Sequence, residues 1–553
     1  MRTIALTGFL AALTLNPLAA VLGQQSTPDL VLTNGKIFTS NTSRPYVEAL
    51  AIRGERIIAA GTSKGISALV GPQTKQIDLG GRTVIPGIND AHNHVEVSPG
   101  DTIELQFDSH DPSWTDVKHA LASPAVTKAS KGAIVLGFVG LSAWRHPEAT
   151  PDALDKLAHD HPVILFVTEH AAMLNSAALA KLDIRENTAN PLGGLYERSA
   201  DGRLTGVIRE YASIQAVRNL ANLTSETDAI EELRKTLSAA AKWGITSVQD
   251  MSNAMTPERC VALLKKVPTP IRVRVIRMPE TTPTGRNIQE GRPAPPISDP
   301  LITVSGTKWM LDGTPLERTF EARDAARHRS DVPFETLFSD LALTFPPPEM
   351  QKMLRESLQD DDQLIVHVFG YNSTSAMLHA MEATGGTRRW AGRRVRFEHG
   401  DGLFPDLIPV AKEMGVVVVQ NPSHLSVGAI FPGLSLEHAQ PLRSLLAAGI
   451  PVALGSDGPT NPYLNIMLAS LHPNRPSEAI TREQAVIAYT LTSAYAEFAE
   501  KDKGSLEPGK LADLAVLSQD IFKVPAEDLP KTESILTLVG GQVVYDARVA
   551  TLQ

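Results

Sequence analysis

Two histidines one residue apart, His92 and His94, follow an apolar run and a Pro-Gly turn in the segment PGINDAHNHVE. If the preceding TVIPGI is a β-strand, side-chain alternation places both imidazoles on the same face at the end of the strand. Imidazole nitrogens placed in this way can bind one metal ion. An isolated His-x-His is more often a pair of exposed loop residues, so a metal site requires further ligands from other parts of the chain.

Candidate ligands lie near the ends of four other apolar runs: Lys308 in GTKWML, His367 in LIVHVFG, His399 in RFEHG and Asp457 in ALGSDG. If these runs are parallel strands of one barrel, their side chains converge at one end of it. Imidazole nitrogen and carboxylate oxygen suit Zn²⁺ or a similar divalent ion. A free lysine ammonium cannot bind a cation. For Lys308 the alternative is therefore an ordinary buried lysine paired with Asp312.

The apolar runs alternate with helical stretches along the middle of the chain, a pattern typical of repeated βα units. Eight such runs predict an α/β fold, a (β/α)8 TIM-type barrel, whose functional groups lie at the C-terminal ends of its strands. The expected strands cover residues 83–90, 244–251, 271–277, 301–311, 363–370, 394–400, 415–421 and 451–458.

The two ends of the chain differ from this middle part. From about residue 29, and again near the C-terminus, short apolar runs alternate with turn signals such as Asn-Gly and Gly-Gly, which predicts β-hairpins. We expect residues 24–82 and 501–553 to form one small β-sandwich domain beside a barrel spanning 83–500. The first two barrel runs are too far apart for one helix, so residues about 100–235 predict a large insertion after strand 1.

The N-terminal residues 1–23 resemble a secretory signal peptide, with an early arginine, an apolar stretch and small residues before Gln24. A membrane anchor is the alternative, although the uninterrupted apolar stretch is short for a span. The signal peptide predicts a secreted protein, periplasmic if the source is bacterial. Sequons at Asn41, Asn222 and Asn372 are compatible with a glycoprotein, although chance alone gives several in a chain of this length.

Composition and charge restrict the partners of the protein. Its 553 residues, 42% hydrophobic and 20% charged, are typical of a large globular chain. The formal charge of −9 provides no basic face for a phosphate backbone, so we expect no nucleic-acid partner. No segment after the N-terminal one is long and apolar enough to predict stable membrane insertion. Cys260 is the only cysteine, so no intrachain disulfide can form, and a homo-oligomer is left open.

Eight segments carry a resemblance that spans nearly the whole mature chain: PGINDAHNH, PVILFVTEHAAMLNSAAL, DGRLTGVIREYA, GTKWMLDGT, HVFG, RFEHGD, VALGSDGP and KGSLEPGKLADLAVLSQD. In this order they resemble the amidohydrolase superfamily of metal-dependent hydrolases, and within it the type-3, YtcJ-like branch. The resemblance implies a binuclear centre of two Zn²⁺, with Mn²⁺ or Fe²⁺ as alternatives. The implied ligands are His92, His94, Lys308, His367, His399 and Asp457.

The resemblance also implies how these residues act. In such enzymes the matching lysine reacts with CO₂, and its carbamate bridges the two metals, which would make Lys308 an anionic ligand. Glu210 is the rival bridging carboxylate, but it belongs to the predicted insertion, so the strand count favours Lys308. His367 and His399 would bind the second metal. Asp457 would be the catalytic residue, taking a proton from water and passing it to the leaving group.

Other residues are candidates for substrate binding. His170 and Asn175 lie in EHAAMLNS, a family segment of the insertion that faces the site, and His424 follows the seventh run. Glu210 joins them if it is not a metal ligand. Surface placement is the alternative for His170, Asn175 and His424.

Two neighbouring segments carry further expectations. Alternation predicts that Glu398 points away from His399 and packs outside the barrel with a basic partner. Relatives usually have H-x-x-G-D after strand five, whereas this chain has HVFGYN, with Tyr371 in the place of the aspartate. Asn372 would begin a sequon on the catalytic side of the barrel, and we expect it to carry no glycan.

These observations predict a secreted, metal-dependent amidohydrolase that cleaves an amide-type C–N bond in a small molecule, such as an N-acyl compound or a formamide. An esterase, a lactonase or a carbamate hydrolase could use the same site, because the fold determines the reaction type better than the substrate. A deaminase or a non-catalytic binding protein could be built on the same metal-binding barrel. Lys308 on strand four argues against the deaminase, because barrel deaminases generally keep one metal.

Overall fold

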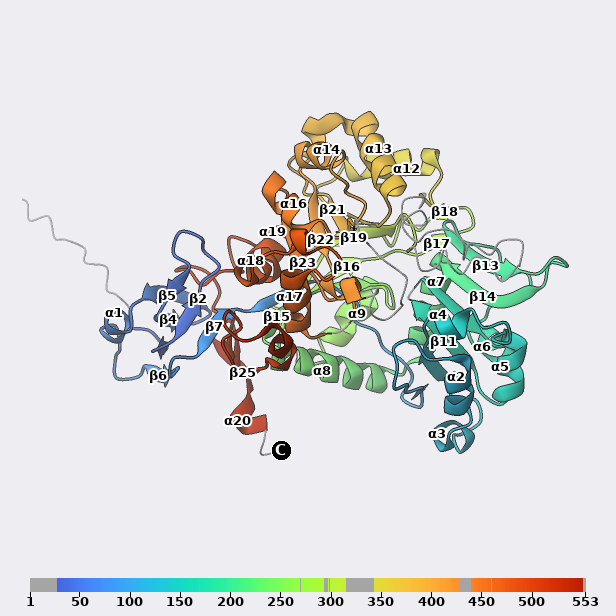
Figure 1. Cartoon of the computed structure of the whole chain (residues 1–553), viewed down its shortest axis with the longest axis horizontal. Helices are drawn as coiled ribbons and strands as arrows, with labels where there is room; N and C mark the ends of the chain where they lie inside the picture. Colours follow the sequence, from blue (N-terminus) through green and yellow to red (C-terminus); the bar gives the residue numbers. More distant parts are fainter. Residues whose placement is uncertain are drawn as a thin grey trace, which may run out of the picture.

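The computed structural model describes residues 27–168, 170–268, 270–292, 297, 299–314, 343–426, 439–458 and 460–550. The sheets built from the chain ends lie at one end of the molecule, a barrel lies in the middle, and a further sheet with its helices lies at the other end (Figure 1). The predicted signal peptide lies outside the described residues.

Eight parallel strands form a nearly closed barrel, as the sequence predicted. Each strand pairs with the next along the chain, in the order β8-β15-β16-β19-β20-β21-β22-β23. Closure between the last strand and the first includes a hydrogen bond from the backbone N–H of Asp457 to the carbonyl of His92, 3.0 Å long. The strands are β8 (Ile88–Asn93), β15 (Ile245–Ser252), β16 (Arg272–Arg277), β19 (Ile302–Met310), β20 (Leu364–Val368), β21 (Arg396–His399), β22 (Val417–Gln420) and β23 (Val452–Leu454).

The first predicted strand, 83–90, is in fact divided between two sheets. β7 (Thr83–Pro86) pairs with strands of the chain ends, and only β8 belongs to the barrel. Gly87 makes the change of sheet possible, since a Cβ atom there would lie 2.1 Å from Oγ1 of Thr246. An apolar run alone does not show such a change of sheet.

Helices follow the barrel strands and cover the outside of the sheet. In α8, the buried residues Ala229, Leu233, Leu237 and Ala240 recur at helical spacing, and the side chain of Ser225 caps the helix by accepting from the N–H of Asp228. The described helices of this part are α8 (Glu226–Lys242), α9 (Pro257–Leu264), α12 (Pro347–Ser357), α13 (Tyr371–Trp390), α14 (Ile408–Glu413), α16 (Leu442–Ala448), α17 (Pro462–Leu471), α18 (Arg482–Ile487) and α19 (Ser493–Ala496). In the described part of the chain, no helix has the length and apolar character needed to span a bilayer.

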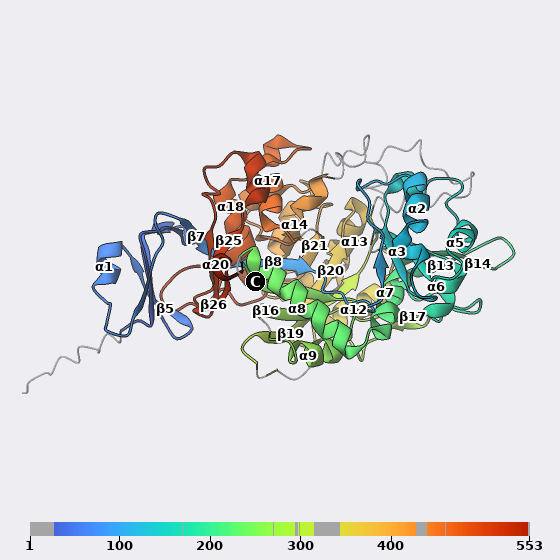
Figure 2. The same cartoon turned by 90° about the horizontal axis from the view of Figure 1, so that it is seen from below.

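Between β8 and β15 the chain builds a separate six-stranded sheet, in the order β13-β14-β12-β11-β10-β9 (Figure 2). Its strands are β9 (Ile103–Glu104), β10 (Val135–Phe138), β11 (Val163–Thr168), β12 (Ala171–Leu174), β13 (Gly194–Arg198) and β14 (Leu204–Glu210). The accompanying helices are α2 (Trp114–Leu121), α3 (Pro124–Thr127), α4 (Leu141–Trp144), α5 (Pro151–Leu157), α6 (Ser176–Lys181) and α7 (Tyr211–Leu223).

The chain ends contribute two further sheets. One contains β1 (Leu30–Thr33), β4 (Ala49–Arg53), β5 (Arg56–Gly61) and β6 (Lys75–Asp78). The other joins both ends of the chain and contains β2 (Lys36–Phe38), β3 (Tyr46–Val47), β7, β24 (Leu514–Leu517), β25 (Ser534–Val539) and β26 (Gln542–Asp546). Leu32, Leu50, Val84, Leu514 and Leu538 belong to one buried cluster, so the two sheets share a core.

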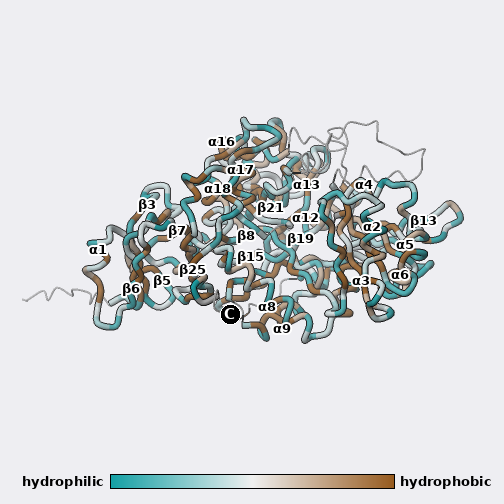
Figure 3. Tube along the Cα trace, turned by 60° about the horizontal axis from the view of Figure 1, so that its bottom comes forward, coloured by the Kyte–Doolittle hydropathy of each residue, from teal (hydrophilic) through white to brown (hydrophobic). Residues whose placement is uncertain are grey.

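Hydrophobic residues run along the strands of all three parts, while hydrophilic residues concentrate in the outer turns (Figure 3). The barrel interior departs from this pattern, because it contains charged and amide side chains. Arg274 and Arg396 both donate to the side-chain oxygen of Gln249, and Arg274 also donates to Gln363. Branched aliphatic side chains usually fill this space in a TIM-type barrel.

Candidate metal centre

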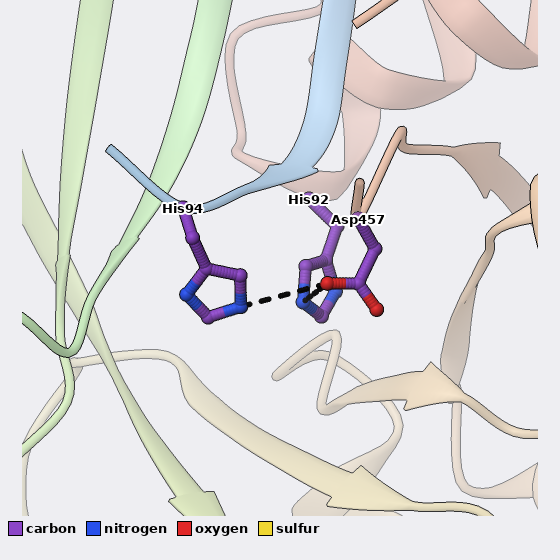
Figure 4. A group of neighbouring side chains, drawn as sticks. All are labelled: His92, His94 and Asp457. Atoms are coloured by element: carbon purple, nitrogen blue, oxygen red, sulfur yellow. Dashed lines mark ion pairs between the residues drawn. The ribbon is translucent and has the colours of Figure 1, made fainter. Parts of the chain in front are cut away.

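Asp457 lies just beyond β23, and His92 and His94 lie at the end of β8, where the barrel closes. The Nε2 atoms of both imidazoles approach the same carboxylate oxygen, Asp457 Oδ1, at 3.5 and 3.6 Å. Figure 4 shows the three side chains directed toward one another from the two segments. Their donor atoms lie within 4.8 Å of one another, so one metal ion could contact all three.

A second group of donors shares Asp457. His399 at the end of β21 and His424 on the 3-10 segment η2 (Pro422–Ser426) complete a second set within the same 4.8 Å limit. Nε2 of His424 is 3.4 Å from Asp457 Oδ2, the oxygen that does not face His94. The two carboxylate oxygens therefore face different groups of imidazoles, as the carboxylate of a ligand between two ions would.

Lys308 is buried on β19, only 2% exposed, and its Nζ atom lies 3.2 Å from Nε2 of His92. Asp312, the partner of the alternative interpretation, instead accepts the Nδ1 hydrogen bond of His367 at 2.9 Å. Backbone N–H groups of Phe369 and Gly370 also donate to Asp312. The structure thus places Lys308 among the predicted ligands rather than in an ion pair with Asp312.

His367 reaches the same cluster from β20. Its ring centroid is 4.5 Å from that of His399, and the His399 and His92 ring centroids are 5.2 Å apart. Among the residues that the structure describes, Nε2 of His367 is buried and has no hydrogen-bond partner. A buried nitrogen without a partner is costly unless something binds it, and a metal ion satisfies this requirement.

Three of the imidazoles are held from behind through Nδ1. Glu398 contacts Nδ1 of His92 at 2.6 Å, Asp312 contacts that of His367, and Asn421 Oδ1 contacts that of His399 at 2.9 Å. An ionised carboxylate only accepts hydrogen bonds, so the rings facing Glu398 and Asp312 carry the proton on Nδ1. Their Nε2 atoms then present a lone pair to the centre. Such outer contacts orient metal-binding histidines.

The expectation that Glu398 packs outside the barrel is wrong. Its side chain is buried in the interior and reaches across to His92, although its basic partner, Arg396, is present as expected. Alternation fails here because His399 adopts a left-handed backbone conformation, with φ of 67°. This turn brings the His399 ring to the metal-binding cluster even though Glu398, one residue earlier, already points inward.

Three residues in or beside the site have a strained backbone. Asp457 has a φ of 42° and Glu210 a φ of 53°, so these two residues share positive φ values with His399. Non-glycine residues rarely adopt this conformation, and it often marks functional positions. Gly455 supports the same geometry, because a Cβ atom there would lie 2.5 Å from the backbone nitrogen of His92. Glycine at this position lets β23 approach the end of β8.

The electrostatics favour neutral imidazoles beside an ionised carboxylate. Burial lowers the pKa of His92 and His399, and it lowers the pKa of His367 to about 4. Burial alone would raise the pKa of Asp457, but its interactions with His92, His424 and their neighbours outweigh burial and hold that pKa below its usual range. Neutral imidazole and ionised carboxylate are the forms that bind a metal.

The donor set therefore fits a divalent metal centre. It offers imidazole nitrogens with buried Nε2 atoms, a carboxylate shared by two groups, and Lys308 within reach of His92. This chemistry suits zinc and similar ions.

The residues predicted to bind substrate fall into two groups. Nδ1 of His170 pairs with Glu210 Oε2 at 2.8 Å, and its ring centroid lies 4.8 Å from that of His367, so this pair adjoins the centre. His424 also adjoins it, as described above. Asn175 has a different role, because its Oδ1 accepts from the N–H of Ala178 and caps helix α6. We therefore assign Asn175 to the folding of this segment.

Tyr371, which replaces the usual aspartate after strand five, lies in the first turn of α13. Its hydroxyl donates to Asp406 Oδ2 at 2.7 Å on the exposed surface. The adjacent Asn372 is exposed, and the absence of a glycan there stays a prediction. A cavity of about 280 Å³ adjoins the centre at His94, with Leu237 and Gly458 in its wall.

Sequence reasoning did not identify the residues behind the imidazoles. Asp312 stands in the segment GTKWMLDGT, and Asn421 ends the seventh run, but the sequence pattern gave neither a role toward a histidine. Arg396 and Glu398 stand two residues apart on β21, which is the one signal that they share a face.

The fold and the site together define a metal-dependent hydrolase on a TIM-type barrel. The chain belongs to the amidohydrolase family, since the family model described as "Amidohydrolase family" matches residues 75–545. It is accordingly a metal-dependent hydrolase that acts on carbon–nitrogen bonds. The predicted family and its YtcJ-like branch are confirmed.

Three curated relatives are similar over nearly their full lengths. Protein LONG AFTER FAR-RED 3 of Arabidopsis thaliana is 26% identical, covering 94% of this chain and 91% of the relative. N-substituted formamide deformylase of Arthrobacter pascens is 24% identical over 94% and 98% of the two chains. Putative amidohydrolase YtcJ of Bacillus subtilis is 25% identical over 93% and 98%.

Solved structures support the fold. An uncharacterised metal-dependent hydrolase from Pyrococcus horikoshii superimposes with a TM-score of 0.66 at 19% identity, covering 90% of this chain and 99% of that one.

Proposed function

We propose that the protein hydrolyses an amide-type bond of a small molecule, with an N-substituted formamide or a related N-acyl compound as substrate. The observation that carries the proposal is the position of Asp457, whose two carboxylate oxygens face separate groups of imidazoles. The Arthrobacter pascens relative, named as a formamide deformylase, supports this substrate class.

The chain's own residues would move the protons of this reaction. A bound divalent ion polarises the scissile carbonyl and lowers the pKa of water. Asp457 accepts the proton that the attacking water loses and delivers it to the departing nitrogen as the C–N bond breaks. One water is consumed, and a carboxylic acid and an amine are released. His424 and the His170–Glu210 pair border the centre and would orient the substrate.

For the centre itself we propose two Zn²⁺ ions, with His92, His94 and Asp457 around one and His367 and His399 around the other. Lys308 would be N-carboxylated and shared by both. The position of Lys308 supports this proposal, because its Nζ atom lies 3.2 Å from Nε2 of His92 and a carbamate there would be an anionic ligand. Glu210 is the less favoured bridging group, since its carboxylate pairs with His170.

Two measurements test the centre. Metal analysis of the purified protein should find two ions per chain, and Lys308→Met should lose at least one of them while Glu210→Gln keeps both. Protein loaded under ¹³C-labelled bicarbonate should show a carbamate carbon resonance that is absent from Lys308→Met. Two ions in Lys308→Met, or loss of metal only in Glu210→Gln, would reassign the bridge.

The activity is tested by a screen of N-substituted formamides, N-acyl amino acids and aryl esters. We expect turnover of a formamide or N-acyl compound, and a fall in kcat of about 10²–10⁴-fold in Asp457→Asn, the size typical of a lost general base or acid. Asp401→Asn is the matched control, because Asp401 is also buried but accepts from the backbone N–H of Gln440. Stoichiometric metal without turnover on any class would refute the hydrolytic function.

We further propose that residues 1–23 direct secretion and that the two end sheets form a β-sandwich domain. We also propose that the insertion forms one wall of the substrate pocket. The contact between His170 of the insertion and His367 of the barrel supports the last proposal. N-terminal sequencing of the protein exported by its natural host tests the first, since a mature chain beginning near Gln24 is expected.

A further inference from the structure

The buried carboxylate of Glu398 is not one of the ligands of the proposed centre, yet it makes a 2.6 Å contact with His92. The two residues come from opposite parts of the barrel sheet, because β22 and β23 separate β21 from β8 in strand order. The contact therefore crosses the barrel interior. A buried charge requires partners, and a single ion pair within β21 would have supplied one.

Arg396 fixes the carboxylate of Glu398 from the same strand. Its Nε atom donates to Oε1 at 2.9 Å, and one of its terminal nitrogens donates to Oε2 at 3.1 Å. That nitrogen also donates to the carbonyl of Ala91 at 2.7 Å. Arg396 and Glu398 together thus hold both the backbone before His92 and the ring of His92 itself.

We propose that Glu398, fixed by Arg396, is a positioning residue of the metal centre that holds His92 with Nδ1 protonated and Nε2 directed at the metal. The inference rests on the metal centre of the proposed function, but not on its substrate or reaction. An ionised carboxylate accepts and never donates, so the hydrogen-bonded Nδ1 carries the proton. The lone pair is then on Nε2, the atom near Lys308 and Asp457.

The contacts of the neighbouring imidazoles support this role of Glu398. Asp312 occupies the equivalent position behind His367, and Asn421 occupies it behind His399. Glu398 differs from both because it reaches its histidine from across the barrel. His92 thereby becomes coupled to a strand that also carries the predicted ligand His399.

The test compares Glu398→Gln with Glu497→Gln. Glu497 is also a buried carboxylate tied to β8, but it accepts from Asn89 at 2.6 Å and Lys503 at 2.8 Å rather than from an imidazole. Zinc affinity of the full-length chain is measured by competition with a chelator, without substrate. We expect Glu398→Gln to bind zinc about 10- to 100-fold more weakly, the usual cost of losing such a contact. Glu497→Gln should match the parent protein.

A spectroscopic measurement and a second variant guard against a general loss of structure. The visible absorption of the Co²⁺-loaded protein should shift in Glu398→Gln and stay unchanged in Glu497→Gln, because only the first alters a ligand's environment. Glu398→Asp keeps the charge beside Arg396 but withdraws it from His92, so it should also weaken zinc binding if Glu398→Gln does not fold. Unchanged affinity and spectrum in the Glu398 variants, or equal losses in Glu497→Gln, would overturn the inference alone. A parent chain that binds no metal would overturn it together with the proposed function.

Discussion

The ends of the barrel strands and the barrel interior beneath them are both polar, but their polar groups are satisfied in different ways. In the interior, Arg396 pairs with Glu398, and both Arg396 and Arg274 donate to Gln249, so these polar side chains are satisfied by one another. At the strand ends, the buried Nε2 of His367 has no partner among the described residues. We call the barrel interior the closed layer, because its polar side chains bind one another. We call the strand ends the open layer, because a ligand can bind there.

The closed layer explains how the open layer keeps its geometry. Unpaired buried nitrogens and positive φ values are costly, and they persist only where the surroundings enforce them. Glu398 of the closed layer provides such enforcement at His92. Breaking one layer should therefore have different consequences from breaking the other.

The largest expected effect comes from removing the metal. Dialysis against a strong chelator should abolish turnover, because the open layer depends on the ion, and added Zn²⁺ should restore it. The circular dichroism of the secondary structure should stay nearly unchanged, since the closed layer needs no metal. Retained turnover, or loss of structure together with activity, would show that the two layers are not separable in this way.

Breaking the closed layer should instead cost stability. Arg396→Met leaves Glu398 buried without its ion-pair partner, which costs about 3–5 kcal/mol of unfolding free energy. Denaturant unfolding of the apo-protein measures this loss. Adding Glu398→Gln to the same chain should recover part of it, because the unpaired charge is removed. No recovery in the double variant would mean that packing rather than charge dominates here.

Acid should lower the unfolding free energy of the apo-protein through His367 in the open layer. Burial holds the pKa of His367 at about 4, below its unfolded value, so only the unfolded chain gains this proton between about pH 6.5 and 4. His367 therefore makes its full contribution to the unfolding free energy above pH 6.5, and this contribution is about 2 kcal/mol smaller at pH 5. Unfolding of the parent and of His367→Asn in chelator, at pH 7 and 5, isolates this difference.

Asp90 and Asp250 change the unfolding free energy in the opposite direction, and they do so in both proteins. Burial raises the pKa of each carboxyl to about 6, so the folded state binds their protons first as the pH falls. Their effect cancels in the comparison of the two proteins. An equal pH dependence in the parent and in His367→Asn would contradict the assignment of a neutral, buried His367.

The smallest expected effect on catalysis lies in the insertion. Asn175→Ala removes the cap of α6 and also leaves the N–H of Val163 and the carbonyl of His161 without this partner, so it should cost about 1–3 kcal/mol of stability. Since Asn175 hydrogen-bonds to backbone rather than to the centre, kcat should not change. His170→Gln is the contrasting variant, because His170 adjoins His367. A kcat loss in Asn175→Ala as large as that in His170→Gln would restore Asn175 to the substrate site.

The strand pattern of the barrel could be predicted because apolar runs separated by helices report a local periodicity. Seven of the eight expected strands overlap the observed ones closely, and the first was wrong only where β7 leaves for another sheet at Gly87. The orientation of Glu398 could not be predicted, because the left-handed backbone of His399 interrupts the alternation on which the expectation depended. No local signal marks such a residue in advance.

The sequence by itself determined the residue types, their order and their strand ends: His92 and His94, Lys308, His367, His399 and Asp457. Ligand chemistry depends on the side chain, and strand ends follow from hydrophobic pattern, so both can be inferred from the chain. Only the tertiary structure decided which atoms face which: Asp312 behind His367, Glu398 behind His92 and Asn175 on a helix cap. Those contacts join residues far apart in the chain, and their geometry arises from closure of the barrel rather than from any local preference.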